Sequence, residues 1–196
     1  MIFIVGPHNS GKTTLAKSMV GLGFIHVETG DIIRQKYKEL NPLTSFQDWA
    51  RKNNTECPHF FDDFILDRVN SVKEKNINCE KKIYDVVVTG NRQIDGIRYL
   101  MEKINTSDIN KNVVIYLDAP IEELYVRQIK RKDRIIPNLN FVNFKDNYLA
   151  FDEEMGLGKI KDFSDFIVDS NKPLREILRE TLSILKKDTI LKRQIN

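Results

Sequence analysis

The first thirteen residues constrain the fold of this chain more than any other stretch. A short apolar run, residues 2–5, leads directly into Gly6-Pro7-His8-Asn9-Ser10-Gly11-Lys12-Thr13, which matches the motif G-x-x-x-x-G-K-T at every fixed position. Residues 15–20 can continue as a helix, so the motif has the preceding strand and the following helix that its structure requires. The pattern predicts a phosphate-binding loop (P-loop), and a chance match in an unrelated loop is the weaker alternative.

Polyphosphate binding explains the spacing of this motif. Gly6 and Gly11 let the backbone wrap without a Cβ in the way, and the helix that begins near Gly11 adds its positive dipole end. We expect the amides of residues 8–13 to face the β-phosphate, Lys12 to reach the β- and γ-phosphates, and the Thr13 hydroxyl to coordinate Mg2+. The predicted ATP-binding residues of the loop are Gly6, His8, Asn9, Ser10, Gly11, Lys12, Thr13 and Thr14. For His8 we favour this backbone role over that of a catalytic base.

Length and charge limit the classes of protein that this chain can belong to. Its 196 residues predict one domain, residues 1–196, and its 31 basic against 28 acidic residues leave a net charge of only +3. That balance favours small anionic ligands over nucleic acid, and no apolar stretch reaches membrane-spanning length. Two cysteines without metal-ligand spacing indicate a reduced, cytoplasmic setting. We expect a monomer or a small homo-oligomer.

Apolar runs of strand type alternate with helical patterns five times along the chain. The predicted strands cover residues 2–5, 24–27, 84–89, 113–117 and 163–168. The predicted helices after the first cover residues 31–40, 45–53, 60–75, 95–104, 120–132, 145–155 and 174–187. This alternation predicts a three-layer α/β/α fold of P-loop NTPase type with a five-stranded parallel sheet. Trp49 and the phenylalanines at 60, 61 and 64 are expected in the core, the alternative being a wall against a nucleobase.

Arginines follow several of the predicted strands. Ligands of such sheets bind at the carboxyl ends of the strands, where Arg34 and Arg92 would lie near the mouth of the P-loop. Arg127, Arg131 and Arg134 recur along one side of the 120–134 segment. Aligned arginines can neutralise a phosphoryl group during its transfer, and a solvated basic surface is the alternative.

The acid that usually ends the third strand of such a sheet and helps to hold Mg2+ is missing. Thr89 stands at that position and brings no charge. Asp31, Asp95 and Asp118 are possible substitutes. We favour Asp31, because it follows a strand next to the P-loop and opens a helix.

Two of these segments, together with the P-loop, resemble nucleoside monophosphate kinases of the adenylate kinase type. Thr29-Gly30-Asp31-Ile32-Ile33-Arg34 matches the family motif T-G-D-x-x-R, and Thr89-Gly90-Asn91-Arg92 loosely matches D-G-x-x-R without its Asp. The resemblance implies that Thr29, Asp31, Arg34 and Arg92 bind the acceptor. It also implies an acceptor-binding flap at residues 32–75.

The second half of the chain is similar to dephospho-CoA kinase. Asp118-Ala119-Pro120 is followed by R-x-x-x-R at Arg127 and Arg131, and the loop with Asn171 and Pro173 follows the last strand. The resemblance implies that Asn171 and Pro173 contact adenine and that residues 125–147 form a small lid.

These resemblances imply a kinase that transfers the γ-phosphoryl group of ATP, with Mg2+, to a nucleoside monophosphate. The expected catalytic residues are Lys12, Arg127, Arg131, Arg134 and Asp31. One alternative is a hydroxyl kinase of the dephospho-CoA kinase type, in which Asp31 would be the base. Another is a P-loop ATPase or regulatory nucleotide-binding protein without a small-molecule acceptor.

Overall fold

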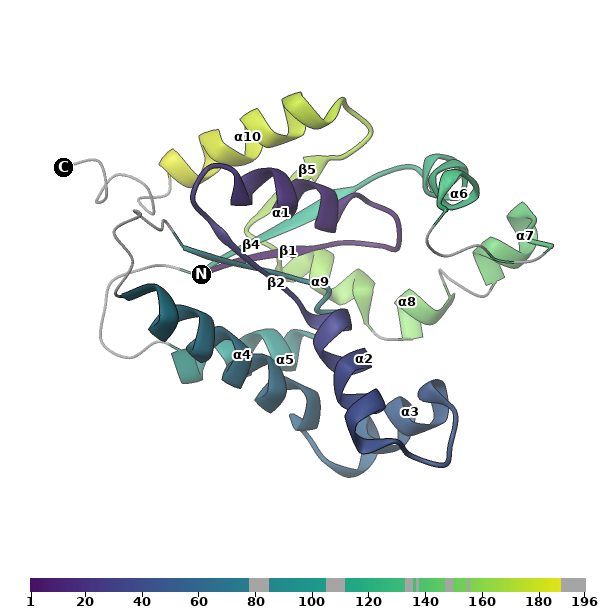
Figure 1. Cartoon of the computed structure of the whole chain (residues 1–196). Helices are drawn as coiled ribbons and strands as arrows, with labels where there is room; N and C mark the ends of the chain where they lie inside the picture. The colour runs from purple at the N-terminus through teal and green to yellow at the C-terminus, as the bar shows by residue number, and fades with distance from the viewer. Residues whose placement is uncertain are drawn as a thin grey trace.

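A five-stranded parallel sheet with the order β2-β3-β1-β4-β5 forms the centre of the molecule (Figure 1). We describe it from a computed structural model that covers residues 1–77, 85–104, 112–132, 136, 138–146, 150–154 and 156–187. The strands are β1 (Ile2–Val5), β2 (Ile25–Glu28), β3 (Val86–Thr89), β4 (Val113–Asp118) and β5 (Phe166–Asp169). Every pairing is parallel, which confirms the fold class predicted from the sequence.

Helices cover both faces of the sheet, because its central strands are apolar on both sides. On one face Ile2 and Ile4 belong to a core shared with α1 (Lys12–Val20) and α10 (Leu174–Lys187). On the other face Phe3 and Val5 belong to a core with α4 (Phe60–Ile77), α5 (Ile94–Ile104) and α9 (Leu157–Phe163). Figure 1 shows α1 and α10 on one side of the sheet and α4, α5 and α9 on the other.

An aromatic cluster joins the three helices that follow β2. Trp49 of α3 (Phe46–Glu56) is only 6% exposed and contacts Tyr37 of α2 (Thr29–Leu40) with ring centroids 5.4 Å apart. Across the cluster it contacts Phe60 and Phe61 of α4 at 6.0 and 5.2 Å. The core position expected for Trp49 is confirmed, and the cluster fixes how α2, α3 and α4 pack together.

The segment between β4 and β5 differs from the sequence prediction. It contains α6 (Ile121–Lys130), α7 (Phe141–Phe144), α8 (Ala150–Glu154) and α9, whereas we expected no helix at 157–163 and a strand from residue 163. Gly156 has a φ of +89° and, instead of only ending a helix, it precedes α9 as the N-cap. Leu157 and Ile160 then pack against the sheet, and the strand starts only at Phe166. Within the described ranges, no helix combines the length and hydropathy needed to cross a membrane.

We predict that Phe3→Ala lowers the free energy of unfolding by about 3–5 kcal/mol, because the fully buried ring fills the space between β1 and the covering helices. The control is Leu43→Ala at a fully exposed position, which should change it by no more than about 0.5 kcal/mol. Urea denaturation followed by circular dichroism measures both. Similar losses for the two variants would contradict this assignment of the core.

Candidate functional site

The P-loop lies against the neighbouring strand β4. Gly6 has a φ of +137°, and a Cβ there would collide with the carbonyl oxygen of Leu117. Gly11, with a φ of +92°, is the N-cap of α1. The Lys12 ammonium folds back and donates to the carbonyl oxygens of Gly6 and Pro7 at 2.8 and 2.6 Å. The glycines therefore permit a tight loop, and the lysine of the motif closes it.

The pKa of Lys12 is lowered to about 8, mainly by burial and to a smaller extent by the positive charge of Arg92. The carboxylates of Asp152 and Glu28 oppose the shift. A polyphosphate bound in the loop would add negative charge beside this amine and so raise its pKa. The site is thus suited to an anionic ligand.

Glu28, the last residue of β2, places a carboxylate against the P-loop threonine. The Thr13 hydroxyl donates to Glu28 Oε2 at 2.7 Å, and the Thr89 hydroxyl donates to the same oxygen at 2.8 Å. His26 Nε2 lies 2.8 Å from Thr89 Oγ1. His26 is the donor in this contact, because the Thr89 hydroxyl already donates its hydrogen to Glu28. Hydroxyl and carboxylate oxygens are the donors that Mg2+ prefers, and a few protein oxygens suffice beside phosphates and water. The residues present therefore fit Mg2+.

The three acids considered from the sequence have other partners. Asp31 is 72% exposed and pairs with Arg34 at 2.6 Å. Asp118 pairs with Lys161 at 2.7 Å, and Asp95 is exposed on α5. The structure places Glu28 against Thr13, where we had favoured Asp31. In the part of the chain that the structure describes, no group of three His, Cys, Asp or Glu residues forms a metal cluster.

Gly90 brings the ends of β2 and β3 together. It has a φ of +98°, and a Cβ there would collide with the hydroxyl of the buried Thr29 and lie 2.8 Å from Glu28 Oε1. Only glycine fits this contact. The residues expected to follow the two strands, Thr29 and Arg92, are thereby placed at one edge of the sheet.

Two arginines lie at the other side of the P-loop. Arg127 belongs to α6, and Arg131 follows it as the C-cap, since the helix ends at Lys130 and not at residue 132 as we expected. Arg127 donates to the carbonyl oxygens of Asn9 and Ser170 at 3.3 and 2.7 Å. Arg131 donates to Asn9 Oδ1 at 3.0 Å, and the Asn9 amide donates to Gln128 Oε1 at 3.0 Å. Arg134 lies outside the described residues. The carbonyl of Ser170 thus connects Arg127 with the loop that contains Asn171 and Pro173.

One cleft of about 2430 Å3 joins these groups. Its walls include Lys12, Thr13, Arg127 and Arg131 at the P-loop, and residues 28–31, 33–34 and 90–96 at the ends of β2 and β3. The Arg34 guanidinium lies over Gly30, where a Cβ would come within 3.1 Å of it. The P-loop and the two predicted acceptor arginines therefore share one cavity.

Two residues of the site were not found from the sequence. Glu28 could have been considered, since it is an acid directly after a predicted strand, and its side chain reaches Thr13 although β3 lies between β2 and β1. Asp152 had no such signal, because it reaches His8 across 144 residues of sequence. Its carboxylate accepts a hydrogen bond from the His8 amide at 2.8 Å. That amide would have to change partner before it could bind phosphate, so the predicted role of the His8 amide stays a prediction.

We predict that Glu28→Gln weakens divalent-metal binding at this site by about tenfold or more, because the carboxylate that touches Thr13 loses its charge. The measurement is Mn2+ affinity by electron paramagnetic resonance in the presence of a non-hydrolysable ATP analogue. Asp31→Asn is the matched control on the exposed acid three residues away, and its affinity should change less than about twofold. If Asp31→Asn weakened Mn2+ binding more than Glu28→Gln did, the metal site would be assigned to Asp31.

Comparison with known proteins agrees with this geometry. The model of the AAA domain family matches residues 5–140, more than half of the chain. Adenylate kinase of Micrococcus luteus is 27% identical over 137 residues, which are 67% of this chain and 62% of that protein. The chain therefore spans less than two thirds of the curated relatives it matches.

Solved structures share the fold at low sequence identity. A gluconokinase from Sinorhizobium meliloti 1021 has a TM-score of 0.59 at 18% identity, over 95% of this chain and 91% of that one. A shikimate kinase from Bacteroides thetaiotaomicron has a TM-score of 0.61 at 14% identity, over 94% and 97%. The chain belongs to the AAA domain family.

Proposed function

We propose that this protein is a phosphotransferase that moves the γ-phosphoryl group of ATP to a nucleoside monophosphate. The observation that carries the proposal is a single cleft with basic groups at two places. Lys12, Arg127 and Arg131 line it at the P-loop, and Arg34 and Arg92 line it at the ends of β2 and β3. Two phosphate-bearing ligands would meet between them.

The reaction would be catalysed by positioning and by charge neutralisation. A monophosphate acceptor is already an anion, so its attack on the γ-phosphorus needs no strong base. Lys12, Arg127 and Arg131 would hold the transferred group and offset its charge. Thr13 and Glu28 would hold Mg2+, which neutralises the β- and γ-phosphates when bound. The order of these charges along the cleft favours phosphate-to-phosphate transfer.

The walls near the acceptor arginines suit a nucleobase. Phe46, Phe60 and Phe61 line the cleft, as do Arg51 and Arg98. Aromatic faces and guanidinium groups both stack on planar rings. We propose that α2, α3 and α4 act as the acceptor-binding flap and that the loop after β5 contacts the adenine of ATP. Ser170 and Lys172 of this loop line the cleft, whereas Asn171 and Pro173 are outside its lining, so their contact with adenine stays a prediction.

A hydroxyl acceptor is the second candidate, because solved structures with this fold include a gluconokinase and a shikimate kinase. Such an acceptor would need a carboxylate base, and Asp31 is the residue that the sequence suggests for that role. In the structure Asp31 is exposed and paired with Arg34, which favours the monophosphate.

An acceptor panel tests the proposal. ADP release from ATP and Mg2+ is measured with AMP, CMP, UMP, GMP, their deoxy forms, dTMP, dephospho-CoA, gluconate and shikimate. We expect one monophosphate to raise turnover about a hundredfold over basal hydrolysis, because an acceptor held beside the γ-phosphate reacts far faster than water. Stimulation by gluconate, shikimate or dephospho-CoA would establish a hydroxyl kinase. ATP binding without stimulation by any acceptor would favour a regulatory ATPase.

We predict that Arg34→Ala raises the KM of that monophosphate about 10- to 100-fold, the range for a lost charge-assisted hydrogen bond to phosphate. The matched control is Lys38→Ala, which removes an exposed positive charge one turn further along α2. Steady-state kinetics at saturating ATP measure both variants. An equal rise in KM for Lys38→Ala would show that the rise comes from the loss of a positive charge on α2 and not from a contact of Arg34 with the phosphate.

A further inference from the structure

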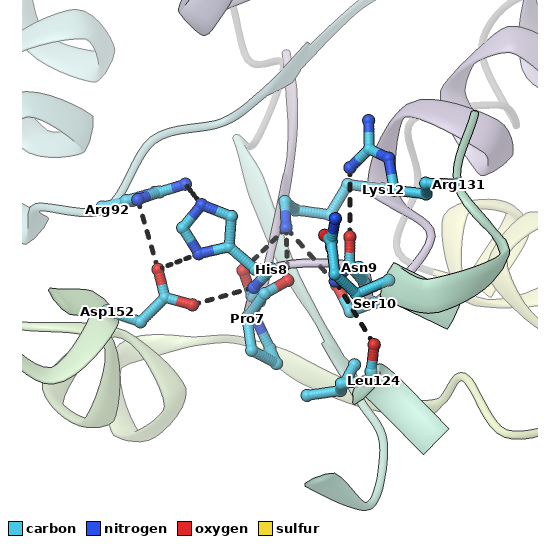
Figure 2. A network of polar contacts seen from close by, with 11 residues as sticks. Pro7, His8, Asn9, Ser10, Lys12, Arg92, Leu124, Arg131 and Asp152 are labelled. Carbon is cyan, nitrogen blue, oxygen red and sulfur yellow. Dashed lines mark hydrogen bonds and ion pairs between the residues drawn. The ribbon is translucent and has the colours of Figure 1, made fainter. Parts of the chain in front are cut away.

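A carboxylate is buried beneath the P-loop. Asp152 belongs to the short helix α8, and the whole residue is only 1% exposed. Its Oδ2 accepts from the His8 amide at 2.8 Å, while its Oδ1 lies 2.8 Å from His8 Nδ1 and 3.2 Å from Arg92 Nη1 (Figure 2). Burying a charge is costly unless charged or polar groups surround it, so these contacts hold Asp152 in place. Three distant segments of the chain meet at this point.

The contact between Arg92 and the imidazole fixes the protonation state of His8. Arg92 Nη2 lies 2.7 Å from His8 Nε2. A guanidinium can only donate, so Nε2 must be the accepting nitrogen of a neutral ring. The ring hydrogen is therefore on Nδ1, which lies 2.8 Å from Asp152 Oδ1. Asp152, His8 and Arg92 thus follow one another in a line of close polar contacts.

The charges around His8 keep this ring neutral. Burial lowers its pKa, and the positive charges of Arg92 and Lys12 lower it further, while Asp152 raises it. The groups that face the ring come from α8, from the loop after β3 and from α1. Protonation would place an N–H against the guanidinium and expel Arg92 from its position.

We propose that His8 is a positioning residue for Arg92. Asp152 orients the imidazole, and the imidazole holds the guanidinium against the P-loop at the wall of the cleft. This proposal rests on the proposed function, in which Arg92 binds the phosphate of the acceptor. A long arginine side chain loses rotamer entropy on binding, and a partner that holds it beforehand reduces this cost. The loop that would bind the donor nucleotide thus also prepares the acceptor site.

The first test needs no ligand. Long-range 1H–15N correlation spectra of histidine-labelled protein distinguish the two neutral tautomers from the imidazolium ion. We expect His8 as the Nδ1–H tautomer at pH 7.5, and Asp152→Asn should alter its signal. Glu153→Gln is the matched control, because Glu153 is an exposed carboxylate next to Asp152 on the same helix. An Nε2–H tautomer or an imidazolium in the wild-type protein would overturn the proposal, since Arg92 could not donate to either.

The second test is a double-mutant cycle on the KM of the monophosphate that the panel selects. We expect Arg92→Ala to raise this KM about tenfold or more and His8→Ala to raise it about fivefold, with no further rise in the double variant. His8→Gln can return an acceptor to the position of Nε2 and should restore most of the loss. As pH falls through the acid side of neutrality, the wild-type KM should rise more steeply than the KM of His8→Gln, because the acceptor phosphate is protonated with both proteins but His8 only in the wild type.

The outcomes separate this inference from the proposed function. A large effect of Arg92→Ala that adds to that of His8→Ala overturns the positioning role and leaves the kinase proposal standing. If Arg92→Ala leaves the KM of the monophosphate unchanged, Arg92 does not bind the acceptor. Both the proposed acceptor site and this inference are then overturned. If His8 had only a general structural role, His8→Ala would raise the KM by the same factor in the wild-type protein and in the Arg92→Ala variant. His8→Gln would then not restore the wild-type KM.

Discussion

The close approach of the P-loop to β4 is the constraint on which the site depends. Gly6 turns away from β1 with a φ of +137°, directly against the carbonyl oxygen of Leu117. Strand β1 pairs with both β3 and β4, so the position of the loop is fixed relative to the ends of both neighbours. The residues that follow those strands can then reach it. A side chain at Gly6 would push the loop outward and separate it from each of them.

Local patterns predicted the parts of the structure that local interactions form. The glycines and Lys12 of the P-loop, the alternation of strands and helices, and the spacing of Arg127 and Arg131 at the end of α6 are all visible within a few residues of sequence. The sheet order was not predicted: β3 lies between β2 and β1, whereas we expected the strand before Asp31 to lie next to the P-loop. The parallel sheet and a cleft at the carboxyl ends of its strands follow from general rules of parallel topology. These features needed no knowledge of distant contacts.

The features that the sequence did not predict depend on distant residues. Asp152 is one of three consecutive acids and carries no mark of burial until α8 is placed beneath the P-loop. Helix α9 was missed because a pair of glycines predicts a break, although Gly156 only caps the helix that follows. Glu28 is a different case, since it directly follows the strand predicted at residues 24–27, and the T-G-D motif directed attention to Asp31 instead. Whether the Glu28 carboxylate points toward Thr13 depends on tertiary packing, which a local sequence pattern does not determine.

The balance of charge in the cleft argues for what the site would bind. Lys12 and Arg92 lie close enough that Arg92 lowers the pKa of Lys12, and Arg131 contributes in the same direction. In the described structure Lys12 donates to carbonyls of its own loop, whereas Arg92 relies on the carboxylate of Asp152. A ligand with several negative charges would relieve this repulsion and replace the carbonyl partners of Lys12. An uncharged ligand would relieve none of it, so the repulsion between Lys12 and Arg92 favours an anionic ligand at this part of the cleft.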